Sequence, residues 1–133
     1  MTPRTILIVD DEANQRLMVE QALRALAFDW TISTAASGQE ALESMALQLP
    51  DLIITDYHMP LMNGLDLIAQ VRARHISSRI ILITAYSSPE LYDAAQQLRV
   101  DHYLTKPVPL TLLRRIATGA LEAESALGDD CRA

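Results

Sequence analysis

The sequence predicts an α/β fold in which five parallel strands form one sheet, doubly wound by helices. Five short apolar segments alternate with five segments whose apolar residues recur every three or four positions. The first of the short segments, Thr5–Val9, is continuously apolar, which is typical of a strand buried on both faces. Strands that alternate with helices imply right-handed crossovers and a parallel sheet covered on both sides.

The predicted strands are short apolar runs with many β-branched residues. The segment Trp30–Ala35 contains more polar residues than the others, so we expect it to be more exposed. The five strands are expected at residues 5–9, 30–35, 52–55, 80–83 and 100–104. Five such units fit the flavodoxin-like strand order 2-1-3-4-5, in which ligands bind beyond the carboxyl ends of the strands.

Between the strands, the apolar residues have helical spacing, so each predicted helix has one face for the sheet. Ser88 and Pro89 form a helix start signal, and Pro60 with Asn63-Gly64 indicates a loop. The helices are expected at residues 12–27, 38–49, 65–75, 89–98 and 109–127. The inward positions are expected to be Val19, Ala22, Leu23, Leu26, Leu42, Met45, Leu49, Leu67, Ile68, Val71, Leu91, Ala94, Ala95 and Leu98.

Length and composition predict one domain, residues 1–127, followed by a disordered tail at 128–133. The net charge of −6 argues against direct nucleic-acid binding by this domain, because such binding needs a basic face. The single cysteine, Cys131, fits a reducing cytoplasm. The sequence has no signal peptide and no apolar run near the ~20 residues of a membrane span, so we expect a cytoplasmic protein with no membrane partner.

Four of the predicted strands end in polar residues that suit a phosphoryl group and its metal ion. The endings are Asp10-Asp11-Glu12, Asp56, Thr84 and Thr105-Lys106-Pro107. Because the carboxyl ends of parallel strands share one edge of the sheet, we expect these side chains to meet there. Clustered carboxylates repel one another unless they hold a proton or a cation, and hard oxygen ligands favour Mg²⁺.

Asp56 is the candidate nucleophile of this group, since it would lie between a cation and the ammonium group of Lys106. The cation and Lys106 would stabilise charge on a transferring phosphoryl group, and the hydroxyl of Thr84 could donate to one of its oxygens. Simpler interpretations remain open. Asp-Asp-Glu after a strand is often a solvated helix start, and Thr84 could cap a turn.

The same residues, in this order and on these strands, resemble the receiver domain of two-component response regulators. The similarity covers the chain from about Arg4 to Leu121. Each short string is weak evidence alone, but together they are specific. The strings are Ile8-Val9-Asp10-Asp11-Glu12, Thr55-Asp56-Tyr57-His58-Met59-Pro60 with Asn63-Gly64, and Tyr103-Leu104-Thr105-Lys106-Pro107.

The resemblance implies a role for each site residue. Asp56 accepts a phosphoryl group from a phosphohistidine on a sensor histidine kinase or phosphotransfer protein. Asp11 and Asp56 ligate Mg²⁺ directly, Asp10 holds it through water, and the backbone carbonyl of His58 is a further ligand. Lys106 pairs with the phosphoryl group, and the bond from Lys106 to Pro107 is expected to be cis.

The resemblance also implies a switch. Thr84 moves toward the new oxygens, Tyr103 swings inward, and the face made by the fourth helix, fifth strand and fifth helix is repacked. Partners would dock on this face: an output domain, a target protein or a second copy in a phosphorylation-dependent dimer. Catalysis would be limited to self-phosphorylation and autodephosphorylation. Whether the chain is a stand-alone regulator or part of a larger one stays open, as does a merely structural role for Tyr103.

Two other function classes are alternatives to this one. A phosphatase or phosphotransferase with an aspartyl-phosphate intermediate, similar to the haloacid dehalogenase-like enzymes, needs a second Asp two residues after the nucleophile, where this chain has His58. A flavin carrier needs a Ser/Thr/Gly-rich loop after the first strand, where Asp10, Asp11 and Glu12 would repel the flavin phosphate. His58 and Tyr86 are also expected to flank the path of the water that removes the phosphoryl group, and to slow or reshape that reaction.

Overall fold

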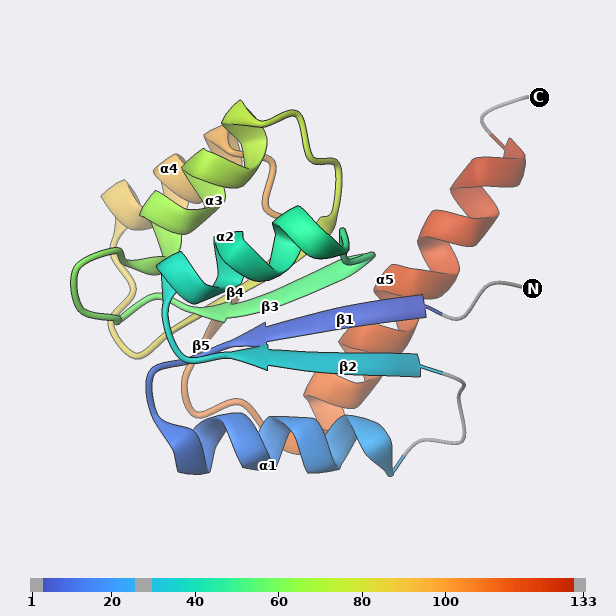
Figure 1. The fold of residues 1–133 in the computed structure, drawn as a ribbon, viewed down its shortest axis with the longest axis horizontal. Coiled ribbons are helices and arrows are strands. Elements are labelled where there is room, and N and C mark those ends of the chain that lie inside the picture. The colour runs from blue at the N-terminus through green and yellow to red at the C-terminus, as the bar shows by residue number, and fades with distance from the viewer. Residues whose placement is uncertain (1–3, 26–29, 131–133) are drawn as a thin grey trace.

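The computed structural model, shown in Figure 1, describes residues 4–25 and 30–130 and the side chains up to Leu121. Its five strands are all parallel and lie in the order β2-β1-β3-β4-β5, so the predicted fold class and strand order are confirmed. The strands are β1 (Arg4–Val9), β2 (Trp30–Ala35), β3 (Leu52–Asp56), β4 (Arg79–Thr84) and β5 (His102–Thr105).

Five helices follow the strands in alternation: α1 (Ala13–Arg24), α2 (Gly38–Leu47), α3 (Gly64–Ala73), α4 (Pro89–Gln97) and α5 (Leu110–Asp130). Three of them begin at a side-chain cap. Ser37 and Ser88 accept hydrogen bonds from backbone N–H groups of the first turn, and Asn63 forms a reciprocal capping box with Asp66. The start signal read at Ser88-Pro89 is therefore confirmed.

The sheet has two apolar faces, each covered by different helices (Figure 1). Successive strand residues point to opposite faces, so each buried strand contributes alternate side chains to both. One face packs against α2, α3 and α4, through residues such as Leu7, Ile53 and Leu82. The other packs against α1 and α5, through residues such as Ile54 and Ile83.

Most of the predicted inward positions are buried, with one clear error at Leu49. Its side chain is 59% exposed, because α2 ends at Leu47 and the backbone becomes extended at Gln48, two residues before Pro50. Leu26 lies outside the described residues. The helix α5 runs to Asp130, past the expected domain end at residue 127. None of the helices in the described part of the chain is both long and apolar enough to cross a membrane.

Acidic side chains link the amino ends of neighbouring strands by hydrogen bonds. The backbone N–H of Thr5 in β1 donates to Asp51 Oδ2, just before β3, at 2.8 Å. The backbone N–H of Ile80 in β4 donates to Asp101 Oδ2, just before β5, at 2.8 Å. Each aspartate thus extends the hydrogen-bond ladder beyond the paired strand residues.

Arg72 of α3 also forms hydrogen bonds that link segments at the amino end of the sheet. Its guanidinium donates to four backbone carbonyls at 2.9 to 3.0 Å, and no acidic side chain takes part. The acceptors are Ile76, Ser78, Leu98 and Arg99. One side chain therefore joins the α3–β4 connection to the end of α4.

Replacing Gly119 in α5 by Ala is expected to stabilise the fold. A Cβ added there meets nothing within 4 Å, so the change brings no steric cost. Alanine loses less conformational freedom than glycine in a helix, and the free energy of unfolding should rise by about 0.5–1 kcal/mol. Urea denaturation measures the change, and an unchanged or lower midpoint would contradict it.

Candidate functional site

Three carboxylates meet at the carboxyl edge of the sheet. Asp10 follows β1 directly, Asp11 comes next, and Asp56 is the last residue of β3. β1 and β3 are adjacent parallel strands, so their ends lie side by side. One oxygen from each of the three carboxylates lies within 4.8 Å of the others, while Asp10 and Asp56 are largely buried. The predicted cluster of acidic residues is therefore present.

Local hydrogen bonds hold the turn that carries Asp10. The Asp10 carboxylate accepts from the backbone N–H of Glu12 at 3.0 Å, and its backbone carbonyl accepts from Arg16 Nη1 at 2.7 Å. Burial raises the pKa of Asp10 above its usual range, the Glu12 N–H opposes this, and the charge of Asp56 raises the pKa further. The site therefore pushes Asp10 toward its protonated form unless a cation is near.

Lys106 reaches this cluster from the end of β5. Its Nζ lies 2.8 Å from Oδ1 of Asp56. Burial works against the charged amine, but the hydrogen bond and charge of Asp56 outweigh it, so the pKa of Lys106 lies above its usual value. Beyond this ion pair, the buried Oδ1 accepts no hydrogen bond from the described residues. The expected cis bond between Lys106 and Pro107 is present.

Thr84 is the last residue of β4 and is fully buried. Its hydroxyl is bound to the backbone of Tyr86, donating to the carbonyl and accepting from the N–H, both at 3.2 Å. Thr84 is therefore engaged with the β4–α4 loop and not with the carboxylates. Any movement toward Asp56 has to break these two hydrogen bonds.

Tyr103 in β5 is half-buried and makes two contacts that the sequence did not reveal. Its hydroxyl lies 2.7 Å from Ser87 Oγ in the β4–α4 loop. Its ring packs edge-on against Tyr92 of α4, with centroids 5.3 Å apart. Because Ser87 follows Tyr86 directly, one short loop contacts both Thr84 and Tyr103.

An aromatic cluster borders the carboxylates on their exposed side. The ring of His58 packs edge-on against Tyr57 at 4.9 Å and against Tyr86 at 5.6 Å. His58 and Tyr86 are the two aromatic residues that the sequence indicates here, and the structure adds Tyr57 to them. Tyr57 and His58 line a shallow hollow together with Asp11, and Tyr86 is 75% exposed, so the cluster lies at the surface beside Asp11 and not within the core.

Gly64, at the start of α3, is a further site residue that spacing alone does not identify. A Cβ added there would lie 2.6 Å from the backbone oxygen of Asp56 and 2.9 Å from Tyr57 Cα. The Gly64 N–H also donates to the Tyr57 carbonyl at 2.8 Å. The backbone of α3 therefore contacts the strand end that carries Asp56. The signal in the sequence is the Asn63-Gly64 pair, which indicates a loop and belongs to the strings that carry the resemblance.

A hollow of about 450 Å³ opens beside Asp10, Asp56 and Lys106. Its other walls are mostly apolar and come from α1, the start of α5 and the ends of β1, β3 and β4. The carboxylate of Asp56 is thus reached from the α1–α5 side of the sheet.

The family profile described as the response regulator receiver domain matches residues 6–118 of this chain. The chain belongs to the response regulator receiver domain family. This receiver domain is 34% identical over 109 residues to the transcriptional regulatory protein PdtaR of Mycobacterium tuberculosis, an alignment covering 82% of this chain and 52% of PdtaR. It is 33% identical to the probable transcriptional regulatory protein TcrX of the same species, over 96% of this chain and 58% of TcrX.

Solved structures give the same assignment for this receiver domain. The signal receiver domain of the putative response regulator NarL from Mycobacterium tuberculosis superposes with a TM-score of 0.82 at 27% identity, covering 92% of this chain and 98% of that one. The chemotaxis protein CheY4 of Vibrio cholerae has a TM-score of 0.81 at 28% identity, covering 90% and 99%. The receiver domain spans about half the length of PdtaR and TcrX, and its relatives are signalling proteins.

Proposed function

We propose that this receiver domain is a phosphorylation-dependent switch in which Asp56 accepts a phosphoryl group from a sensor histidine kinase or phosphotransfer protein. The observation that carries the proposal is the 2.8 Å contact between Asp56 and Lys106 beside two further carboxylates. Lys106 neutralises one oxygen of Asp56 and leaves the other for attack. The hollow beside Asp56 provides space for an incoming group.

The residues present fit Mg²⁺. Three carboxylates close together carry more negative charge than Lys106 balances, and one buried Asp56 oxygen has only the lysine as partner. We propose Asp11 and Asp56 as direct ligands, Asp10 as a ligand through water, and the backbone carbonyl of His58 as the last protein ligand. Bound Mg²⁺ would offset the negative charge of a phosphoryl group during transfer.

The test is incubation of the protein with Mg²⁺ and a small phosphodonor such as acetyl phosphate, followed by intact-protein mass spectrometry. We expect a gain of one phosphoryl group that disappears when a chelator removes the metal. An unchanged mass with this donor and with a phosphorylated histidine phosphotransfer protein would overturn the proposal.

The contacts of Thr84 and Tyr103 suggest how the phosphoryl group is sensed. If Thr84 turns toward the phosphoryl oxygens, it releases the backbone of Tyr86. The neighbouring Ser87 then loses its fixed position, and with it the hydrogen bond to the Tyr103 hydroxyl. Tyr103 becomes free to leave Tyr92 and move inward. This two-state loop would pass a local charge change to the surface of α4, β5 and α5.

The partners follow from this arrangement. A kinase or phosphotransfer protein would act upstream in the cytoplasm, and an output domain, a target protein or a second copy would read the α4–β5–α5 face. The chemistry would remain confined to the domain itself, as phosphoryl acceptance and autodephosphorylation. His58 stands where the haloacid dehalogenase-like enzymes have their second Asp, so the general acid of those enzymes is missing at that position.

Removing either member of the aromatic pair is expected to speed loss of the phosphoryl group. The ring of His58 lies beside Asp11 and packs against the ring of Tyr86, so truncation of either should ease the approach of water to the carboxylates. We expect the rates for His58→Ala and Tyr86→Ala to rise on the order of 2- to 10-fold, or ~0.4–1.4 kcal/mol in activation free energy.

The measurement is the decay of phosphorylated protein followed by intact mass after donor removal. Leu61→Ala is the control, because Leu61 lies in the same β3–α3 loop with a fully exposed side chain. Rates equal to the unmodified protein in both variants would refute a role for the aromatic pair.

A further inference from the structure

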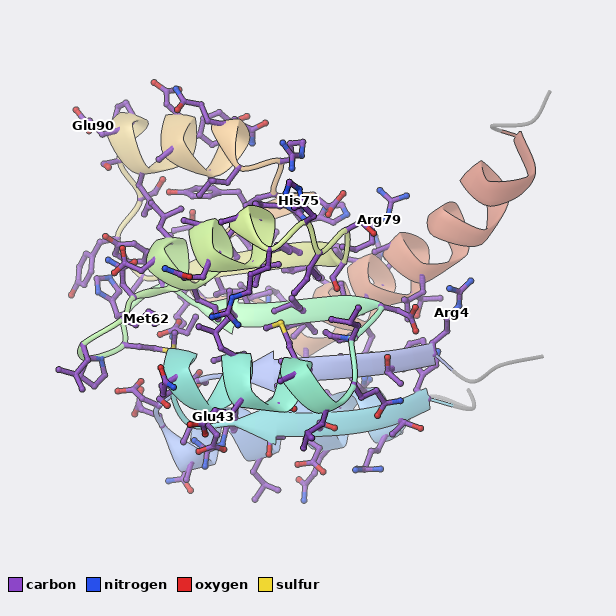
Figure 2. All side chains as sticks on the ribbon, turned by 45° about the horizontal axis from the view of Figure 1, so that its top comes forward. Arg4, Glu43, Met62, His75, Arg79 and Glu90 are labelled. Carbon is purple, nitrogen blue, oxygen red and sulfur yellow. The ribbon has the colours of Figure 1, made fainter. Side chains whose placement is uncertain are left out.

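At the amino end of the strands, opposite the carboxylate site, lies a hollow of about 400 Å³. It is formed by the last turn of α3, the α3–β4 connection and the end of α4. Its charged walls include three arginines and one aspartate. We call it the basic pocket; its lining residues are Arg72, His75, Ile76, Ser77, Ser78, Arg79, Arg99 and Asp101. Figure 2 shows His75 and Arg79 at this end of the molecule.

Most of the polar groups around the basic pocket already have partners. Asp101 accepts from Arg79 Nη1 at 3.1 Å and from the Ile80 N–H, and Arg72 donates to four carbonyls. The Arg99 guanidinium and the His75 ring have no hydrogen-bond or ion-pair partner among the described residues. The pocket therefore has an excess of positive charge with at least one uncommitted cation.

The pKa of Arg72 agrees with this excess of positive charge. Burial lowers the pKa of Arg72 below its usual value, the charge of Asp101 raises it, and the charge of Arg99 lowers it again. Arg99 thus adds positive charge close to an arginine that is already partly buried. An anion in the pocket would offset the repulsion between the positive charges of Arg72 and Arg99.

His75 and Arg99 also share an unusual backbone conformation. His75 and Arg99 each follow the end of a helix and have φ angles of 59° and 60°. Glycine or asparagine is favoured at such a position, because a side chain there is strained. Both positions instead carry a side chain that bears or can accept a positive charge, and both side chains line the same pocket. Leu61 has a similar φ of 70°, so the conformation is not specific to the pocket, but at these two positions it coincides with side chains that line one hollow and carry or can accept a positive charge.

The far part of α5 offers the complementary charge. Between Ile116 and Asp130 the chain has four acidic residues and no Lys or Arg: Glu122, Glu124, Asp129 and Asp130. The last buried residue of the described side chains in α5 is Leu121. Beyond it the helix continues to Asp130 and projects past the amino ends of the strands (Figure 1).

We infer that the acidic end of α5 from a second copy of this chain docks in the basic pocket. In a symmetric pair, each copy would offer its helix end to the pocket of the other, which is the self-complementary geometry of a two-fold dimer. Arg99 and His75 would be the principal contacts. This inference concerns the unmodified protein and does not depend on phosphorylation at Asp56.

The test measures self-association of the unphosphorylated chain by sedimentation velocity over a range of protein and salt concentrations. We expect a concentration-dependent dimer whose dissociation constant rises about tenfold or more between low and high salt, because opposite charges are screened. A monomer at every concentration at low salt would overturn the inference, as would a dimer indifferent to salt.

Substitution by asparagine separates binding from folding. Asparagine tolerates a positive φ, so Arg99→Asn and His75→Asn should keep or increase thermal stability and yet weaken the dimer. Gln21→Glu with Gln39→Glu is the control, because it makes the net charge more negative at exposed positions of α1 and α2 that do not line the pocket. Equal weakening in the control would overturn the inference, because the effect would then be net repulsion.

A charge exchange tests the proposed pairing itself. Arg99→Glu and the double variant Asp129→Arg/Asp130→Arg should each dimerise poorly alone and form a heterodimer when mixed. Failure to recover binding on mixing would overturn the pairing. Binding of a short random-sequence DNA duplex that Arg99→Asn abolishes, without any dimer, would show that the pocket serves a nucleic acid instead.

Discussion

Asp56→Asn is expected to abolish phosphoryl acceptance while leaving the fold intact. The amide has nearly the shape of the carboxylate but is a far weaker nucleophile, so no aspartyl phosphate forms. The variant also removes one charge from the cluster of Asp10, Asp11 and Asp56, which should weaken Mg²⁺ binding. Intact mass after incubation with Mg²⁺ and acetyl phosphate should stay unchanged.

Asp93→Asn is a matched control, since it makes the same chemical change at an exposed position of α4. It should gain the phosphoryl group at the rate of the unmodified protein. A mass gain in Asp56→Asn at that same rate would refute Asp56 as the acceptor, and peptide mapping would then identify the modified residue. Circular dichroism of both variants should match the parent.

Gly64→Ala is expected to cost about 3 kcal/mol of unfolding free energy, at the upper end for overpacking, because its Cβ would meet backbone atoms. The new carbon would lie 2.6 Å from the Asp56 carbonyl oxygen and 2.9 Å from Tyr57 Cα. Neither atom can move without displacing the end of β3 or the start of α3. Urea denaturation should show a much lower midpoint, and phosphoryl acceptance should slow because Asp56 is displaced.

Gly38→Ala is the informative comparison. Its added Cβ would come within 2.6 Å of Sδ and 2.9 Å of Cγ of Met62, so the Met62 side chain must turn as a whole, but the three nearest atoms include no backbone atom. Figure 2 shows Met62 extending from the β3–α3 loop toward the start of α2. We expect a loss of less than about 1 kcal/mol there, because the thioether can turn away. Equal losses in the two variants would refute the distinction between backbone and side-chain contacts.

The sequence was sufficient to predict the sheet order and the carboxylate cluster. Buried parallel strands are continuous apolar runs, and their polar endings must share one edge once the strand order is known. Asp10, Asp11, Asp56 and Lys106 could therefore be brought together without coordinates. The error at Leu49 arose because helical spacing was extended to the residue before Pro50, where the chain had already left α2.

Contacts between distant side chains and backbone could not be predicted in this way. Arg72 lies on a helix with ordinary spacing, and nothing in its neighbourhood indicates that it binds carbonyls 26 and 27 residues away. The hydrogen bond from Ser87 to Tyr103 likewise depends on how one loop folds over β5. Such contacts are set by packing geometry, which the pattern of apolar residues does not encode.

Because side chains alternate between the two faces of the sheet, the proposed phosphoryl acceptor and the residues proposed to sense the phosphoryl group lie on different faces. The side chain of Asp56 belongs to the same face of the sheet as that of Ile54, which is the face covered by α1 and α5. Thr84 belongs to the same face as Leu82, and Tyr103 packs on that side, which α4 covers. Under the proposed function the phosphoryl group would be received on one face of the sheet and sensed on the other. The surface of α4, β5 and α5 lies at the β5 edge and includes elements from both faces, so a reader bound mainly on the α4 side would leave the hollow beside Asp56 open to a donor.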